Sequence, residues 1–154
     1  MSRRTVFLLT FPPVVVLDQL SKYLAAGRID PFAPLEVLPF LNLVNIRNVG
    51  AAFGLFTSMG NAFFIAVSLV AIALIGFLIA RERDGTAGLS LVLAGAVGNL
   101  IDRLAFGYVR DFVDLHAGSH HWPAFNVADS ALTVGIALLL AGPLMSKRSA
   151  KKAP

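Results

Sequence analysis

The organisation of the chain depends on residues 107–130, which read GYVRDFVDLHAGSHHWPAFNVADS. This stretch is the most polar passage between two strongly apolar segments, and it holds three of the nine acidic residues: Asp111, Asp114 and Asp129. Asp129 opens the last apolar run, so we expect it at the start of a helix, where a membrane meets water. The stretch therefore predicts a polar site at one membrane surface, framed by the other segments.

The composition is that of a membrane protein. Of the 154 residues, 56% are hydrophobic and 14% are charged, and the mean hydropathy is +0.75, whereas a soluble domain needs a more polar surface. The net charge of +4 could indicate nucleic-acid binding, but the basic residues are scattered or adjoin apolar runs. That pattern favours membrane orientation and no nucleic-acid partner. Because cysteine is absent, disulfides, thiol catalysis and cysteine-based metal sites are excluded.

Four apolar runs are predicted to be transmembrane helices, at about residues 5–26, 61–80, 87–105 and 127–145. A helix of about twenty residues reaches about 30 Å, which is one bilayer core. The first run follows two arginines and ends near Ala25 and Ala26, like a secretory signal peptide, but Asp18 and Lys22 interrupt its apolar core. We therefore expect it to be retained, within a single integral membrane domain over residues 1–154.

Lysine and arginine gather on one side of this predicted topology. Eight of the thirteen lie at the N-terminus, in the turn 81–85 and in the tail 147–152, which share one side of a four-span protein. That side is predicted to be cytoplasmic, so both termini are cytoplasmic. The loops 27–60 and 106–126 are then extracytoplasmic.

The first of these loops is too long to be a simple connection. Residues 35–38 and 41–46 alternate apolar with polar or small residues, which predicts two short strands in a small sheet on the outer membrane surface. The fold class is therefore a mainly α membrane protein with four transmembrane helices and a small β-containing extracytoplasmic subdomain.

Polar residues fall at a similar depth in three of the spans, in the outer third of the bilayer. These residues are Asp18, Lys22, Asn99, Asp102, Arg103 and Asp129. Asp18 and Lys22 are four residues apart, so they share a helix face and can pair. A charge near the bilayer centre costs about 2.5–3.5 kcal/mol, so several charges at this depth indicate a functional role. The alternative is that Asp18–Lys22 and Asp102–Arg103 are ion pairs that only fix helix packing.

Asp111 and Asp129 are the candidate catalytic pair. Asn126 followed by Asp129 resembles a helix N-cap with an acid at the third helical position, and the simplest interpretation of Asp129 is a capping acid. That does not explain Asp111, which must fold back over the same place. The positive helix end favours an ionised Asp129, while Asp111 lies between apolar residues and is the candidate to keep a proton. Two such carboxylates can activate a water and protonate a leaving amide nitrogen.

Other candidate sites are weaker. Ser21 and Lys22 could suggest a Ser/Lys peptidase, but neighbours on a helix do not face each other. His116 and His120 have helical spacing, but a glycine and a serine lie between them and no glutamate accompanies them, so we interpret the histidines as surface residues and predict no metal site. Asp114 is interpreted as a solvated loop acid.

Five motifs, taken in order, resemble bacterial lipoprotein signal peptidase (signal peptidase II). They are Asp18-Gln19-Leu20-Ser21-Lys22, Asn48-Val49-Gly50-Ala51-Ala52-Phe53, Gly95-Ala96-Val97-Gly98-Asn99-Leu100-Ile101-Asp102-Arg103, Val109-Arg110-Asp111-Phe112 and Phe125-Asn126-Val127-Ala128-Asp129. Each motif alone is weak, but five in order, covering the chain from the first span to the fourth, are specific. The departures from the family pattern are Ser21 for a commoner Thr, Ala94 for a frequent Gly, and Arg110 where an apolar residue is usual.

The resemblance implies an aspartic endopeptidase of the bacterial inner membrane, with its active site on the extracytoplasmic side. Such enzymes remove the signal peptide from prolipoproteins by cutting before a diacylglyceryl-modified cysteine. The family's catalytic aspartates fall on Asp111 and Asp129. Its other site residues, which we expect to bind substrate, fall on Asp18, Lys22, Asn48, Asn99, Asp102, Arg103 and Asn126. The expected partners are lipid-modified prolipoproteins and membrane lipid; we expect no cofactor and a monomer.

Two other classes of protein fit part of the sequence. A proton-coupled transporter would use Asp18, Asp102 and Asp129 as relays, but it needs acids along the whole membrane path, and the inner halves of the spans are apolar. A structural membrane subunit would use the polar residues for helix packing only, and it leaves the two long outer segments unexplained.

Overall fold

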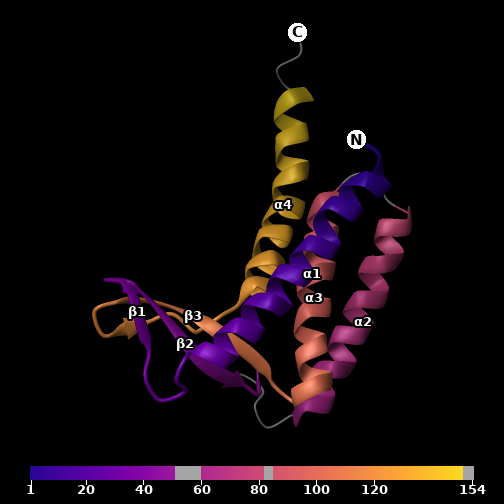
Figure 1. Ribbon diagram of the computed structural model, residues 1–154. Coiled ribbons are helices and arrows are strands. Elements are labelled where there is room, and N and C mark those ends of the chain that lie inside the picture. The colour runs from indigo at the N-terminus through magenta and orange to yellow at the C-terminus, as the bar shows by residue number, and fades with distance from the viewer. Residues whose placement is uncertain (51–59, 82–84, 151–154) are drawn as a thin grey trace.

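Four helices form a bundle, and a small sheet projects from one end of it (Figure 1). The computed structural model describes residues 1–50, 60–81 and 85–150, with side chains as far as residue 142. The helices are α1 (Arg3–Arg28), α2 (Gly60–Arg81), α3 (Thr86–Phe106) and α4 (Val127–Ala150). Each of the four predicted spans is covered by one of these helices, so the mainly helical fold is confirmed.

Local signals at the helix ends explain where two of the helices begin or stop. The Ser2 side chain accepts a hydrogen bond from the backbone N–H of Thr5 at 3.1 Å and caps the start of α1. At the other end of the bundle, Gly107 stops α3 with a left-handed φ of 83°, and its N–H donates to the Arg103 carbonyl. Gly107 is thus the turn from which the polar stretch leaves the bundle.

Helix α3 lies at the centre and contacts each of the other three helices. Three small residues on its surface, Ala94, Gly95 and Gly98, allow this close approach. A Cβ added at Gly95 would clash with the Ala128 carbonyl oxygen of α4, and one at Gly98 would meet an Asp18 carboxylate oxygen of α1 at 2.5 Å. Ala94 is fully buried. The close packing at these small residues brings the polar faces of α1, α3 and α4 together.

The sheet has four antiparallel strands in the order β1-β2-β3-β4. They are β1 (Leu35–Leu38), β2 (Leu41–Asn48), β3 (Val109–Ala117) and β4 (His120–His121). The two strands predicted in the first outer loop are confirmed. Strands β3 and β4 lie where an irregular loop was expected, because polar side chains on the buried face of β3 hide the usual alternation. Residues 51–53 of the second motif lie outside the described part of the chain.

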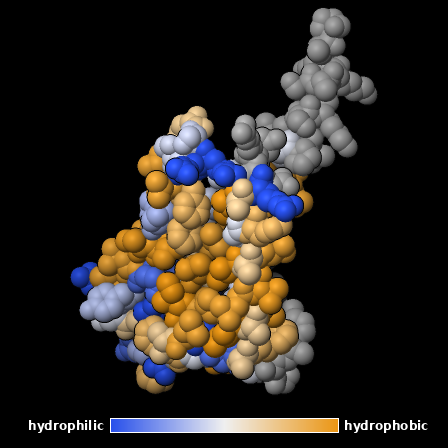
Figure 2. Space-filling view, turned by 90° about the vertical axis from the view of Figure 1, so that its right-hand side faces the viewer, coloured by the Kyte–Doolittle hydropathy of each residue, from blue (hydrophilic) through white to orange (hydrophobic). Residues whose placement is uncertain are grey.

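The sides of the bundle are apolar. Figure 2 shows a broad hydrophobic band over the helices, with hydrophilic residues at its two ends. Within the described ranges, α2 and α3 are each long and apolar enough to cross a bilayer, and α4 contains a shorter apolar helical stretch, Val127–Gly142. On α1, Asp18 and Lys22 are fully buried while Leu8, Leu9 and Leu17 are exposed, so its charges point into the bundle rather than outward.

Candidate active site

Asp111 lies on β3 with its carboxylate held by two asparagine amides. Asn48 Nδ2 donates to Oδ2 at 2.9 Å, and Asn126 Nδ2 donates to Oδ1 at 2.7 Å. In the β2–β3 register, Asn48 lies opposite Val109, which is two residues before Asp111 and on the same face of the sheet. The Asn48 side chain can therefore reach Asp111. The side chain is almost completely buried, with 2% exposure. The position is therefore dry, although Arg110 precedes it.

Asp129 and Asn126 form a capping box at the start of α4, as the sequence predicted. The Asp129 backbone N–H donates to Asn126 Oδ1 at 3.0 Å, and the Asn126 backbone N–H donates to Asp129 Oδ2 at 3.2 Å. The remaining carboxylate oxygen, Oδ1, accepts from Asn99 Nδ2 of α3 at 2.8 Å. Asp129 is thus tied both to its own helix and to the central helix.

Asn126 brings the two acids to one place. Backbone pairing of Phe125 with Val113 lays this residue beside β3, and its fully buried amide then bonds Asp111 while its own cap bonds hold Asp129. Burial, together with repulsion from the nearby Asp129 carboxylate, raises the pKa of Asp111 to about 6. Asp111 therefore holds a proton up to a higher pH than an ordinary aspartate does.

Behind the acids lies a buried ionic cluster of Asp18, Lys22, Asp102 and Arg110. Lys22 Nζ lies 2.8 Å from Asp18 and 3.7 Å from Asp102, and all three of these side chains are fully buried. Lys22 Nζ also donates to Asn99 Oδ1 at 3.0 Å. Because Asn99 in turn donates to Asp129, the cluster orients an amide of the site. Asp18 also accepts from the Ala128 backbone N–H at 2.8 Å, which fixes the first turn of α4.

The partner of Asp102 differs from the one that the sequence suggested. The possible Asp102–Arg103 ion pair is wrong: Asp102 pairs with Arg110 at 2.7 Å and accepts two further hydrogen bonds from it. Adjacent residues on a helix point about 100° apart, so Arg103 faces elsewhere. Its guanidinium donates to the Gly50 carbonyl at 3.3 Å and lies over the Phe64 ring, next to the site.

Asp114 is not the solvated loop acid that we expected. Because β3 is a strand, Asp114 points to one face of the sheet, where it is buried. It accepts a hydrogen bond from Asn42 Nδ2 at 3.2 Å and lies 3.0 Å from His121 Nδ1. His116 stacks on His121. In the described ranges, no three histidine or acidic side chains are grouped so as to hold a metal ion. Asp114 therefore holds the β3–β4 hairpin, apart from the two acids.

Two cavities meet at Asp129, and both are also lined by Asn48 and Leu132. One, of about 270 Å³, lies between α2, α3 and α4 and includes Asn99, Arg103, Val67 and Ala71 in its lining. The other, of about 610 Å³, lies between the hairpin and α4, with Leu115, Trp122, Phe125 and Val134 in its lining. Its walls are mostly apolar. A chain running from one cavity to the other would pass over Asp129.

Known proteins share this sequence and fold. Residues 10–145 match the profile of the family described as signal peptidase (SPase) II. The lipoprotein signal peptidase of Thermodesulfovibrio yellowstonii is 46% identical over 127 residues, 82% of this chain and 86% of that protein. That of Geobacter metallireducens is 43% identical over 145 residues, 90% of each chain. The chain belongs to the signal peptidase II family.

The fold agrees with this assignment. A solved structure described as a bacterial membrane enzyme at 2.3 Å resolution superposes with a TM-score of 0.83 and 30% identity, over 99% of this chain and 93% of the other. A second, at 1.9 Å, has a TM-score of 0.78 and 32% identity, over 92% of both chains. As a signal peptidase II, the protein is an aspartic peptidase and a membrane enzyme. The resemblance predicted from five motifs is thereby confirmed.

The structure brings the predicted site residues together. All but Arg103 are joined by side-chain hydrogen bonds and ion pairs, and Arg103 is linked to Asn48 through the backbone of Gly50. Gln19 and Arg110, for which the sequence predicted no role, also join this set. Gln19 Nε2 donates to Asp18 and to the Gly98 carbonyl at 3.0 Å, and its Oε1 accepts from Arg110 at 3.2 Å. The sequence did contain a signal for Arg110. A partly buried cation needs a carboxylate partner, and Arg110 lies next to apolar residues at the start of β3.

Proposed function

We propose that this signal peptidase II cleaves diacylglyceryl-modified prolipoproteins just before the lipidated cysteine, with Asp111 and Asp129 as its catalytic acids. Family membership carries the broader activity, removal of signal peptides from prolipoproteins. The observation that carries the assignment of the acids is the bridge made by Asn126. Its amide bonds Asp111 at 2.7 Å while its side-chain oxygen and backbone N–H bond Asp129.

The proposed setting is the bacterial inner membrane, crossed four times as one domain over residues 1–154, with the site on the extracytoplasmic side. The first residues of α1 and the last turns of α4 lie at the same end of the bundle, and the sheet lies at the opposite end (Figure 1). That agrees with a cytoplasmic location of both termini, where lysine and arginine are most frequent. The acids are near the sheet end, within reach of water and of a substrate anchored by lipid.

The proposed chemistry divides the work between the acids. Asp129, stabilised as a carboxylate by the Asn99 amide and the first turn of α4, takes a proton from a water whose oxygen attacks the scissile carbonyl carbon. Asp111 is buried, and its raised pKa suits it to the role of proton holder; in the protonated form it gives that proton to the substrate as the carbon–nitrogen bond breaks and the amide nitrogen leaves. The reaction needs only these carboxylates, water and one copy of the chain, with no cofactor.

Other residues position the substrate and the acids. Asn48, Asn99 and Asn126 hold the carboxylates, and Arg103, beside the smaller cavity, is suited to bind a peptide carbonyl. Asp18, Lys22 and Asp102, which we expected to bind substrate, are fully buried and line neither cavity. We therefore assign the buried ionic cluster an indirect role, through Asn99 and through the start of α4. The larger, apolar cavity fits the acyl chains of the substrate, and the smaller one fits the peptide on the other side of Asp129.

Cleavage of a diacylglyceryl precursor by purified protein in detergent tests this proposal. Asp111→Asn and Asp129→Asn should each lower cleavage to background while the protein still folds and binds the precursor, because an amide cannot exchange the proton. Asp114→Asn is the matched control, a buried carboxylate on the same strand as Asp111 that should retain substantial activity. Robust cleavage by either of the first two variants, with thermal melts to verify folding, would overturn the aspartic assignment.

A further inference from the structure

The sheet carries a second polar face, which points away from the acids. Alternation along β2 and β3 puts Asn48 and Asp111 on one face, and Arg47 and Arg110 on the other. Tyr108 directly precedes β3. The Arg47 guanidinium lies over the Tyr108 ring at 5.2 Å. The Tyr108 ring in turn contacts the ring of Phe106, the last residue of α3, with 6.0 Å between centroids. Arginine and aromatic side chains thus continue from the sheet onto the end of α3.

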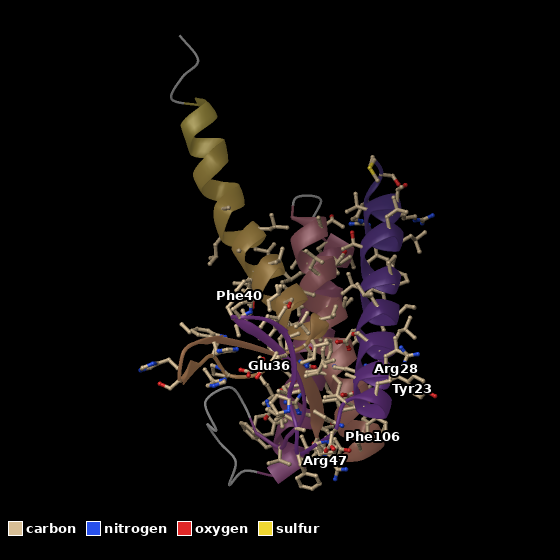
Figure 3. The ribbon with its side chains drawn as sticks, turned by 60° about the vertical axis from the view of Figure 1, so that its left-hand side comes forward. Tyr23, Arg28, Glu36, Phe40, Arg47 and Phe106 are labelled. Carbon is tan, nitrogen blue, oxygen red and sulfur yellow. The ribbon has the colours of Figure 1, made fainter. Side chains whose placement is uncertain are left out.

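The last turn of α1 joins this surface. Asn45 Nδ2 of β2 donates to the Ile29 carbonyl at 3.1 Å, which ties the strand to the end of the helix that carries Arg28. Figure 3 shows Tyr23, Arg28, Arg47 and Phe106 together at the end of the molecule opposite the N-terminus. We call these four residues and Tyr108 the outer arginine–aromatic patch.

Two positive charges in this patch are uncompensated. Arg28 and Arg47 are both exposed, and in the described ranges neither lies within ion-pair distance of a carboxylate. Arg110, on the same face of the sheet, differs because Asp102 neutralises it. A pair of free guanidinium groups beside aromatic rings is suited to an anion that carries an apolar body.

Exposed apolar side chains lead along the helices to the patch. Leu20 and Leu24 of α1 and Leu104 of α3 are all exposed, and they lie within a turn or so of Tyr23 and Phe106. In a four-span placement, the patch therefore lies where acyl chains end and phosphate groups begin. Tyrosine and arginine at this level are typical of the membrane interface, where the arginine fork can hold a phosphate in two hydrogen bonds.

We propose that the outer arginine–aromatic patch binds the headgroup phosphate of an anionic phospholipid in the outer leaflet of the inner membrane. Arg28 and Arg47 bind the phosphate, and Tyr23 and Phe106 contact the upper part of the lipid. Such a lipid anchors the sheet face behind Asp111 at the membrane surface. The proposal rests on the membrane placement proposed above and not on the peptidase chemistry.

Native mass spectrometry of the full chain, released from detergent with added lipid, tests the proposal. Phosphatidylglycerol is the anionic probe, phosphatidylcholine the zwitterionic one and inorganic phosphate the free anion. The double variant Arg28→Gln/Arg47→Gln should bind phosphatidylglycerol about tenfold or more weakly than the unaltered chain. Each single variant should show part of that loss, which keeps the test valid if the double variant folds poorly.

Arg81→Gln is the matched control, because Arg81 is also exposed and lies over an aromatic ring, Phe77 at 4.8 Å, but at the other end of the bundle. It should bind phosphatidylglycerol as the unaltered chain does. Equal loss in both variants, equal binding of the two lipids, or displacement of phosphatidylglycerol by inorganic phosphate would overturn the proposal. Cleavage of the precursor in detergent should persist in the double variant, so failure here is distinguishable from failure of the peptidase assignment.

Discussion

Asn126 makes three kinds of hydrogen bond, and a smaller side chain at this position should keep the cap but lose the others. It caps α4, donates a hydrogen bond from its amide to Asp111, and donates another from the same amide to Asn99 Oδ1 of α3 at 3.3 Å. Serine is also a good N-cap, so it should keep the helix start while losing the reach to Asp111.

We therefore predict that Asn126→Ser lowers kcat for precursor cleavage by about 100-fold, the scale expected when one oriented donor is lost, with little change in KM. Thermal melts should show that the fold is retained. Asn45→Ser is the control, since this asparagine also joins two elements, but away from the acids. Near-normal kcat in Asn126→Ser would contradict the bridge.

The pKa of Asp111 predicts how stability depends on pH. Burial and Asp129 raise this pKa from 3.8 to about 6. Between pH 3.8 and about 6, Asp111 is therefore mostly protonated in the folded chain and mostly ionised in the unfolded chain. The free energy of unfolding should therefore fall as pH rises from about 4 to above 6, by up to about 3 kcal/mol. Melts of the unaltered chain and of Asp111→Asn across this range should differ by that slope; parallel curves would contradict it.

Arg110 should matter for stability although the family usually has an apolar residue there. In Arg110→Leu, the fully buried Asp102 keeps Lys22 at 3.7 Å but loses its nearer cation, so we expect a loss of about 2 kcal/mol or more in the free energy of unfolding. Arg47→Leu is the control: it is paired with Arg110 in the strand register but is exposed, and should cost less than about 1 kcal/mol. Denaturant or thermal unfolding in detergent would measure the loss of stability in both variants. Equal losses would argue against a stabilising role of the Asp102–Arg110 ion pair.

At the scale of elements, close approach of α3 to its neighbours controls the site. Gly98 leaves room for the Asp18 carboxylate and for Ala128, whose Cβ lies 3.2 Å from the position that a Gly98 Cβ would take. A methyl group there would push apart the helices that carry Lys22, Asn99 and Asp129.

We predict that Gly98→Ala lowers the free energy of unfolding by about 1–3 kcal/mol, as overpacking does, and strongly reduces precursor cleavage. Gly76→Ala is the control, because this glycine of α2 has open space around the added Cβ. It should be neutral or slightly stabilising, since alanine favours helix. Melting temperatures and initial cleavage rates of the two variants test the difference, and a harmless Gly98→Ala would show that the helices can separate without cost.

For the whole molecule, the proposed topology can be tested by single-cysteine labelling, because the chain has no cysteine of its own. Ser119→Cys, in the turn between β3 and β4, should react with a membrane-impermeant maleimide added from outside the inner membrane. Ser2→Cys, at the start of α1, should react only after lysis. Labelling of Ser2→Cys in intact cells would overturn the cytoplasmic placement of the N-terminus.

Several features follow from the sequence by itself, because they depend on residues close together in the chain. Length and apolarity predicted the four helices, alternation predicted β1 and β2, and spacing predicted both the Asp18–Lys22 pair and the cap between Asn126 and Asp129. The motif order then predicted the family. The functional roles assigned to individual site residues stay predictions.

Only the tertiary structure decided how the second outer segment folds. Strand β3 pairs with β2 across more than sixty residues of sequence, and its alternation sends Asp111 toward Asn48 and Asn126 but Arg110 toward Asp102. This register also buries Asp114, which looked like a loop acid. Such partners could not be inferred from spacing, because polar side chains on the buried face remove the hydrophobic pattern that reveals a strand, and strand register is set by packing against distant segments.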